Sequence, residues 1–336
     1  MAVAEDMGSV VKPTRFAFRS FDRQWIIPDN RLLLSARPEL WENFGPRQIY
    51  LASLEKRAPS GGPSVTFAGL LPDMNFYKGS NGGRVFPLWA DAGAMQSNIA
   101  PNLLQVMADA HGEAISAPDV MAYLAAVLAH PAFTARFAAD LIQPGLRVPL
   151  TADAGLFTEA VALGREVVWL HTYGERFDDA AAGRPKAAPR LPKGEAPSIP
   201  AEGMIPGAPE PLPDDMRYEP EKQRLHVGSG YIDNVTKAMW DYEVSGKQVV
   251  RQWFSYRRRD RSRPIIGDRR PPSPLDKIQP DHWLPEYTRD LIDLLNVIGG
   301  LVKLEPKQAD LLQRILDHPL ITVAALHPAA DNASDS

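Results

Sequence analysis

A proline-rich segment limits what this chain of 336 residues can fold into more than any other feature. Ten prolines occur in the 38 residues from 183 to 220, where hydrophobic residues follow neither helical nor strand spacing. Because proline lacks a backbone N–H and has a fixed φ, such a segment cannot pack as a core helix or strand. We therefore predict a linker or a long surface excursion there. It separates two subdomains, 14–182 and 221–326, and we expect disordered ends at 1–13 and 327–336.

The first subdomain changes from strands to helices along the chain. Strand patterns occur at 14–18 and 24–27 around a polar turn, and again in "SVTFAGLL" and "GRVFPLW", with Gly- and Pro-rich loops between them. Ser116 and Asp119 fit a capping box for a helix that ends at His130, and Pro131 can open the next helix. A third helix is predicted at 153–163, ending at Gly164. "EVVWLHTY" after it fits a buried strand or a continued helix.

The second subdomain begins with strand patterns in "QRLHVGSGYIDNV". Ser245 and Gln248 fit a second capping box, and Val249, Val250, Trp253 and Phe254 predict the buried face of the helix that follows. Two more helices are predicted at 286–302 and 307–316. The fold class is therefore α+β, with mixed short-strand sheets, packed helices and two subdomains.

The composition excludes several classes of site. There is no cysteine, so disulfides, thiolate zinc sites and Cys nucleophiles are excluded, as a reducing cytoplasm would allow. We find no signal-peptide h-region, and the longest apolar run, "VMAYLAAVLA", is half of the roughly 20 residues that a membrane span needs. We therefore expect a cytoplasmic protein.

Positive charge is concentrated in one place. The net charge of the chain is −4, yet the stretch 247–271 carries nine cations and two carboxylates, a local charge of +7 that leaves −11 for the remainder. A basic block on an acidic body is typical of a phosphate-binding surface. A solvated helix end followed by a loop is the alternative interpretation.

Motifs of catalysis are missing. The sequence contains no P-loop, no G-x-G-x-x-G, no G-x-S-x-G, no amino-methyltransferase signature and no H-x-x-x-H pair. The carboxylate pairs Asp178-Asp179 and Asp214-Asp215 lie in or near the proline-rich segment, where solvated charge is expected. We nominate no catalytic residue, metal site or cofactor, and we predict a protein that binds.

Four blocks of sequence resemble one family in the same order. "FRSFDRQWIIPD" resembles the Y-R-P-F-D-x-R-x-x-Y element that opens the C-terminal specificity domain of Type ISP restriction–modification enzymes. "PDVMAYLAAVLAHPAFTARFAADL", "RVPL" and "LFTEAVALGREVVWLH" together resemble its central block. "VSGKQVVRQWFSYR" resembles its G-G-x-x-x-x-x-W-x-x-x-R element, and "LPEYTRDLIDLLNVIGGLVKLEPKQADLL" its closing helices. The resemblance covers about 15–326.

The resemblance implies a target-recognition-domain-like fold and a DNA-reading function in phage defence. Such a domain reads a short asymmetric DNA site and holds the duplex against an adenine methyltransferase. The methyltransferase, the helicase-like ATPase and the nuclease of the family are absent from this sequence, so we expect no enzyme activity. We expect those domains to be supplied elsewhere, with this chain a separate subunit, a truncated gene or an excised piece.

Two sets of residues are predicted to contact DNA. Cations suit phosphates, and the phosphate-facing set is Lys247, Arg251, Arg257, Arg258, Arg259, Arg261 and Arg263. Forked donors and amides suit base edges, and the base-reading candidates are Arg19, Arg23, Asn75, Lys78, Asn81 and Arg84. The last four lie in "NFYKGSNGGR", which could equally be a solvated hairpin turn. Phe21, Trp25 and Trp253 are predicted to be core residues.

Two other functions stay open. The basic helix could dock an acidic protein such as a methyltransferase subunit, with the proline-rich segment as a recognition peptide. A complex formed without DNA would favour that. A deep pocket with convergent polar groups far from the arginines would instead favour an enzyme of unrecognised chemistry.

Overall fold

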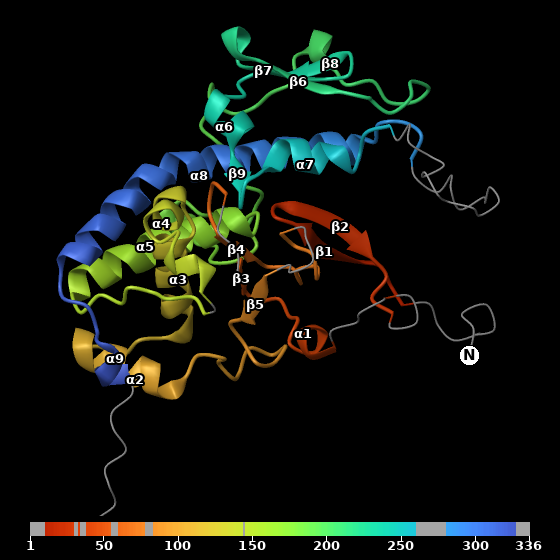
Figure 1. Ribbon diagram of the computed structural model, residues 1–336. Coiled ribbons are helices and arrows are strands. Elements are labelled where there is room, and N and C mark those ends of the chain that lie inside the picture. The colour runs from red at the N-terminus through yellow and green to blue at the C-terminus, as the bar shows by residue number, and fades with distance from the viewer. Residues whose placement is uncertain are drawn as a thin grey trace, which may run out of the picture. The chain divides into compact units, whose positions relative to one another are not determined.

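A computed structural model describes residues 11–29, 33, 38–54, 60–77, 83–143, 145–259 and 280–326 (Figure 1). The chain divides into two compact units. Unit 1 comprises Met1–Ala187, Val244–Gly246 and Leu304–Ser336, and unit 2 comprises Ala188–Glu243 and Lys247–Lys303. The described parts have the predicted α+β character, with helices and small antiparallel sheets. The predicted disordered ends lie outside the described residues, except 11–13, which form no regular element.

Unit 1 begins with a hairpin. β1 (Thr14–Arg19) pairs antiparallel with β2 (Asp22–Ile26), so both strands predicted near the start are confirmed. Phe21 adopts a φ of 61° in the turn between them. The pairing places Arg15 opposite Trp25 and Ala17 opposite Arg23. These four side chains share one face of the ribbon because side chains alternate along a strand.

A three-stranded antiparallel sheet follows, in the order β4-β3-β5. β4 (Val65–Ala68) and β5 (Arg84–Pro87) lie where strands were predicted, but the central strand β3 (Tyr50–Ser53) was missed. All four residues of β3 are buried. A short helix, α1 (Pro38–Glu42), precedes this sheet.

The helices of unit 1 are α2 (Pro101–His111), α3 (Ala117–Leu128), α4 (Pro131–Arg136), α5 (Ala154–His171) and α9 (Val323–Leu326). The capping box at Ser116 is confirmed, since its hydroxyl accepts from the Asp119 N–H and the Asp119 carboxylate accepts from the Ser116 N–H. The predicted end of α5 at Gly164 is wrong, and the ambiguous segment after it is helical. The helices α3 and α5 lie side by side (Figure 1). Gly164 instead marks their close approach, since a Cβ there would lie 1.7 Å from the Ala122 carbonyl oxygen.

The closing helices are one element rather than two. α8 runs from Pro285 to Asp317 with Pro306 inside it, so the break predicted between 302 and 307 is wrong. Its residues up to Lys303 belong to unit 2, and those from Leu304 onward belong to unit 1. No helix of the described residues is long and apolar enough to cross a membrane.

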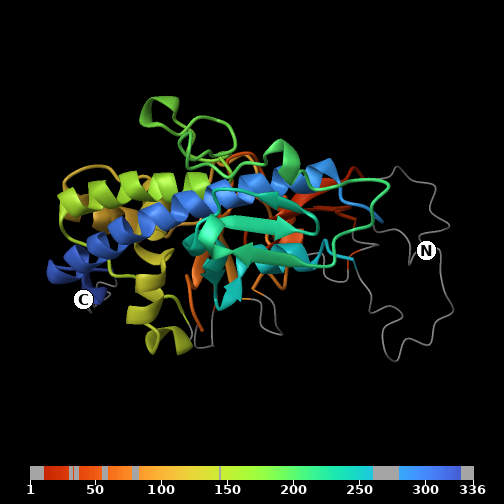
Figure 2. The ribbon, with the colours of Figure 1, turned by 90° about the horizontal axis from the view of Figure 1, so that it is seen from above.

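Unit 2 contains another three-stranded antiparallel sheet, in which β7 (Arg224–Val227) lies between β6 (Met216–Glu219) and β8 (Gly230–Ile232) (Figure 2). The short helix α6 (Lys237–Asp241) follows it. β9 (Glu243–Val244) and β10 (Lys247–Gln248) then form a two-stranded ladder that leads into α7 (Val249–Ser255).

The second predicted capping box is wrong. Ser245 and Gly246 have φ values of 48° and 74° and turn the chain between β9 and β10. The residue before α7 is Gln248, and its side chain makes no capping hydrogen bond. The predicted buried face of α7 is confirmed, because Val249, Val250, Trp253 and Phe254 are all buried.

The proline-rich segment contains short 3-10 turns, among them Ala201–Gly203, and ends in the strand β6. The prediction that it forms no strand is therefore wrong for its last residues, which pair with β7 at the edge of the sheet. Its residues from Ala188 onward are part of unit 2. Leu191, Ile205 and Leu212 are each 9% exposed, and Ser198 pairs with Asp233 beside β8. Of the two alternatives, these contacts favour an excursion that packs on its unit over a free linker.

Candidate functional site

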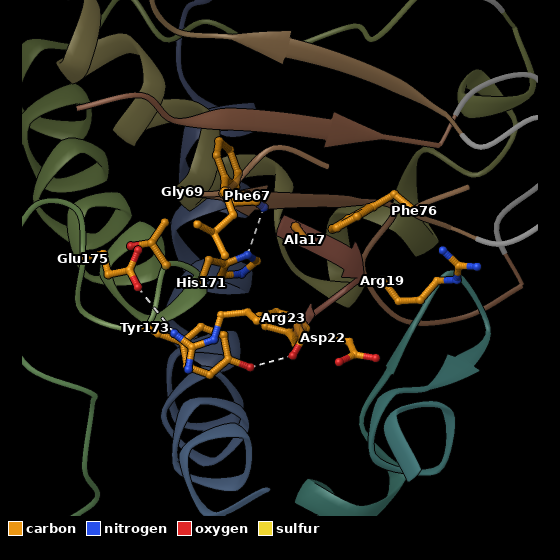
Figure 3. Close-up of a pocket in the computed structure, with 14 residues that line it drawn as sticks. Ala17, Arg19, Asp22, Arg23, Phe67, Gly69, Phe76, His171, Tyr173 and Glu175 are labelled. Atoms are coloured by element: carbon orange, nitrogen blue, oxygen red, sulfur yellow. Dashed lines mark hydrogen bonds and ion pairs between the residues drawn. The ribbon is translucent and has the colours of Figure 1, made fainter. Parts of the chain in front are cut away.

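A pocket lies in unit 1 where the β1–β2 hairpin meets β4 and the end of α5 (Figure 3). It encloses about 330 Å³ of empty space, part of which is open to solvent. Two of the predicted base-reading residues, Arg19 and Arg23, line it, together with the buried Asp22. We call the contacts that fix the hairpin here the hairpin joint, made by Phe21, Arg23, His171, Tyr173 and Glu175.

His171 forms the base of the hairpin joint. Its side chain is buried, and its Nδ1 accepts a hydrogen bond of 3.0 Å from the backbone N–H of Phe67 (Figure 3). The Phe21 ring lies 4.9 Å from the imidazole, centre to centre. Burial lowers the pKa of His171 to about 3, so the ring is neutral near pH 7 and carries its proton on Nε2.

Tyr173 connects the hairpin turn to the end of α5. Its hydroxyl donates a hydrogen bond of 2.6 Å to the carbonyl of Phe21. The guanidinium carbon of Arg23 lies 3.7 Å from the centre of the Tyr173 ring, and its Nη1 lies 3.4 Å from Glu175 Oε1 (Figure 3). Cation–π, ionic and hydrogen-bond contacts therefore hold the hairpin turn in one orientation within unit 1.

Arg19 and Asn75, both predicted to read bases, share a partner. Asp73 Oδ1 accepts hydrogen bonds from Arg19 Nη1 at 2.9 Å and from the Asn75 backbone N–H at 2.8 Å. Arg84 is exposed on β5, and Lys78 and Asn81 lie outside the described residues. The structure thus groups Arg19, Arg23 and Asn75 near the hairpin turn, in conformations where both arginines have acidic partners.

Unit 2 carries exposed cations around α7, which we call the basic surface: Lys247, Arg251, Arg258 and Arg259. The guanidinium carbon of Arg251 lies 4.6 Å from the centre of the Trp240 ring. Trp240 is buried and is stacked on Tyr218 at 5.7 Å with an interplanar angle of 19°. The backbone N–H of Arg259 donates to the Pro213 carbonyl at 2.9 Å. The ring contact positions the Arg251 side chain, and the backbone hydrogen bond fixes the main chain at Arg259.

Arg257 requires a correction to the phosphate-facing set. It is 5% exposed, its guanidinium carbon lies 3.9 Å from the centre of the Trp253 ring, and its Nη1 donates to the Trp253 carbonyl at 2.9 Å. A side chain buried in this way cannot reach a phosphate. Arg261 and Arg263 lie outside the described residues.

Trp25 was predicted to be a core residue, and this prediction is wrong. Phe21 and Trp253 are buried at 7% and 2% exposure, as predicted, but Trp25 is 57% exposed. The sequence reasoning also missed Arg15, whose guanidinium carbon lies 4.7 Å from the centre of the Trp25 ring. The alternation of side chains along "RQW" could have indicated that Trp25 is exposed. Gln24 lies opposite the buried Phe16, so Trp25 points to the other face of the ribbon, together with Arg23.

Within the described ranges, no three His, Asp or Glu side chains are grouped as ligands of a metal ion would be. The arrangement that the described residues do offer is cationic and aromatic.

Three solved structures with a similar fold are complexes with DNA or with a DNA substrate mimic. The chain is similar to the cryo-electron-microscopy structure of a DrdV–DNA complex, with a TM-score of 0.60 at 16% identity over 94% of this chain. It is also similar to a nuclease-deletion mutant of the Type ISP restriction–modification enzyme LlaGI in complex with a DNA substrate mimic, with a TM-score of 0.55 at 15% identity. A third is the ATP-dependent Type ISP restriction–modification enzyme LlaBIII bound to DNA, with a TM-score of 0.56 at 14% identity.

All three alignments cover 94% of this chain. The chain spans only part of each solved relative: 29% of the DrdV chain, 26% of the LlaGI chain and 19% of the LlaBIII chain. No curated protein matches the chain. A family model described as the Type ISP C-terminal specificity domain matches residues 5–294. This match extends over most of the sequence and includes both the hairpin and the basic surface. The chain therefore belongs to the Type ISP C-terminal specificity domain family.

Proposed function

We propose that this chain recognises a DNA target sequence for a Type ISP-like restriction–modification system, and that it acts by binding rather than by catalysis. The observation that carries the proposal is the family match over residues 5–294. The DNA-bound state of the three solved structures with the same fold supports it. A cytoplasmic location, where a restriction–modification system meets DNA, is part of the same proposal.

The basic surface would supply the phosphate contacts. Lys247, Arg251, Arg258 and Arg259 are exposed within unit 2, and each contact with a phosphate releases condensed counterions. Such contacts set the register and orientation of the duplex without reading its sequence. Arg261 and Arg263, outside the described residues, stay in the proposed set, whereas Arg257 leaves it.

Sequence would be read near the hairpin turn and β5. Arg19, Arg23, Asn75 and Arg84 keep their nomination as base-reading residues, together with Lys78 and Asn81 outside the described residues. Arg19 and Arg23 would have to exchange Asp73 and Glu175 for base edges. Because an unsatisfied partner is costly, only a base that replaces those hydrogen bonds well would be accepted, which favours discrimination.

The other activities would come from elsewhere. The chain spans less than a third of each solved relative, so an adenine methyltransferase and a motor-nuclease would have to be supplied by other domains or subunits. In that arrangement the chain positions the duplex for them.

The first test is selection from a random-sequence duplex library by the purified chain at physiological salt. Enrichment of one asymmetric motif of several base pairs is the expected result. Retention without enrichment, abolished by added salt, would restrict the function to phosphate binding. If no DNA is retained, the proposal fails, and a salt-sensitive complex with a methyltransferase subunit, the docking alternative, becomes the function to test.

A further inference from the structure

The outer part of the hairpin carries the most exposed tryptophan of the protein. All seven tryptophans lie within the described residues, and Trp25 is the only one in the exposed class, at 57%. Trp169, Trp240, Trp253 and Trp283 are buried, and Trp41 and Trp89 are half-buried. A single exposed apolar side chain is normal on a protein surface, so Trp25 is informative through the groups arranged around it.

The Arg15 guanidinium packs against the Trp25 ring. The two residues face each other across the hairpin, and the Arg15 guanidinium carbon lies 4.7 Å from the centre of the indole. A hydrogen bond of 2.9 Å from Arg15 Nη1 to the Arg23 carbonyl fixes the guanidinium along β2. The indole is therefore covered by a cation on one side while more than half of the residue stays accessible.

The hairpin is also a rigid support. The hydrogen bond of 2.6 Å from the Tyr173 hydroxyl to the Phe21 carbonyl ties the hairpin turn to the end of α5. Rigid elements position a binding side chain better than loops do. The cations Lys12 and Arg15 lie on or next to this ribbon, so a strand of phosphates would be attracted to it.

We propose that Trp25 is a stacking platform for a nucleobase that has left the DNA helix, with Arg15 beside it for the neighbouring phosphate. This inference rests on the proposed function. Bases inside a duplex present only their edges, and their faces are covered by the next base pairs, so an indole face can stack only on an unstacked base. Enzymes that modify a base draw it out of the duplex, and a domain holding that duplex would meet unstacked bases.

The test uses the full chain with two fluorescent DNA probes of the same sequence. One is an intact duplex, and the other carries a single extra, unpaired 2-aminopurine. We expect the wild-type chain to prefer the second probe and to quench its fluorescence. Trp25→Ala should weaken binding to the unpaired probe about tenfold, the loss that truncation of one stacking aromatic produces, and abolish the quenching. Trp25→Phe should retain most of both.

Phe86→Ala is the matched control, because Phe86 is an exposed aromatic of β5, at 36% exposure. It should leave the preference unchanged, and thermal melting would show that all variants are folded. Equal binding of both probes by the wild type, or an equal loss on both probes in Trp25→Ala, would overturn the stacking role while leaving DNA recognition intact. A wild-type chain that binds neither probe would instead overturn the proposed function itself.

Discussion

Three consecutive arginines at the end of α7 have different surroundings. Arg257 is buried against Trp253 and lies 5.5 Å, by its guanidinium carbon, from the centre of the Tyr287 ring, whereas Arg258 and Arg259 are exposed. The hydrogen bond from Arg257 Nη1 to the Trp253 carbonyl spans four residues, one helical turn. Arg257 thus belongs to the interior of unit 2, and its neighbours belong to the basic surface.

We predict that Arg257→Met lowers the free energy of unfolding by about 1–3 kcal/mol, because the Trp253 carbonyl loses its donor and the cation–π contacts disappear. Arg258→Met, the matched control, should change it by less than about 0.5 kcal/mol. Urea unfolding measures both. The salt dependence of DNA binding should fall in the Arg258 variant and stay constant in the Arg257 variant, and the reverse order would contradict the assignment.

Two buried histidines make stability depend on pH. Burial lowers the pKa of His130 to about 4 and that of His171 to about 3, whereas both would titrate near 6.5 in the unfolded chain. Because the folded pKa values are the lower ones, the folded state keeps its full stability above pH 6.5. It loses stability as the pH falls from 6.5 towards the folded pKa values of about 4 and about 3. Glu305 acts in the opposite direction, because burial raises its pKa to about 7.

We therefore predict that the stability of His130→Asn and of His171→Asn falls less steeply than that of the wild type between pH 6.5 and 4.5. Each substitution should reduce the slope by up to about 1.4 kcal/mol per pH unit, the value for one proton. Glu305→Gln should make the fall steeper. Urea unfolding at several pH values provides the comparison, and identical slopes in all four proteins would refute the linkage.

At the residue scale, the helical spacing of side chains predicts which residues around α7 are buried better than the charge pattern does. Val250, Trp253 and Phe254 were recognised as one buried face, and Arg257 continues the same helical spacing, so its burial could have been predicted. The acidic partners of Arg19 and Arg23 could not, because Asp73 and Glu175 are 54 and 152 residues away and are brought near only by the fold.

At the scale of elements, one close contact between helices explains why α5 continues through a glycine. Gly164 was expected to end α5, since glycine often follows a helix. In the structure it is an internal residue whose missing side chain lets α5 approach the Ala122 carbonyl of α3. A helix interior tolerates glycine when the neighbouring backbone is this near.

We predict that Gly164→Ala lowers the free energy of unfolding by about 1–3 kcal/mol, although alanine is the better helix former. Its Cβ would lie 1.7 Å from the Ala122 oxygen, so α3 and α5 would have to move apart. Ala162→Gly, at an exposed site of α5, is the control and should cost about 1 kcal/mol through helix propensity alone. Chemical denaturation distinguishes the two. An increase in stability for Gly164→Ala would mean that the two helices are not in contact there.

Pro306 gives a prediction of the opposite sign. It lies inside α8 with an exposed side chain, and an internal proline costs a helix about 3 kcal/mol through its missing N–H and its ring. We predict that Pro306→Ala raises the free energy of unfolding by about 1–3 kcal/mol, whereas Lys307→Ala next to it stays within about 0.5 kcal/mol. Thermal unfolding checks both. A loss of stability would show that α8 needs its proline.

Some elements could be predicted and others lacked a local signal. The hairpin, β4, β5, α3, β7 and β8 follow their turn and cap residues, whereas β6, β9 and β10 were missed. α2 was missed although Pro101 at its start and Gly112 after its end are standard signals. β3 is four residues long and buried throughout, so it has no alternation to recognise, and pairing with β4 and β5 creates it.

At the scale of the whole molecule, the distribution of charge matters more than its sum. A protein with a net charge of −4 would repel DNA if only the total counted. Screening at physiological salt limits charge interactions to about 8 Å, so a phosphate responds to the cations next to it. The basic surface can then bind DNA on an acidic protein, and this reasoning can be tested by removing equal charge from two places.

We predict that replacing all four cations of the basic surface by alanine makes the negative slope of log Kobs against log salt shallower by about 3 to 4. Each lost phosphate contact accounts for about 0.9 of this change. The control replaces four other exposed lysines by alanine: Lys186, Lys193, Lys222 and Lys307. Both proteins have a net charge of −8 in place of −4. DNA binding measured from low to physiological salt should keep the wild-type slope in the control. If both slopes fall equally, the total charge governs binding and the basic surface has no special role.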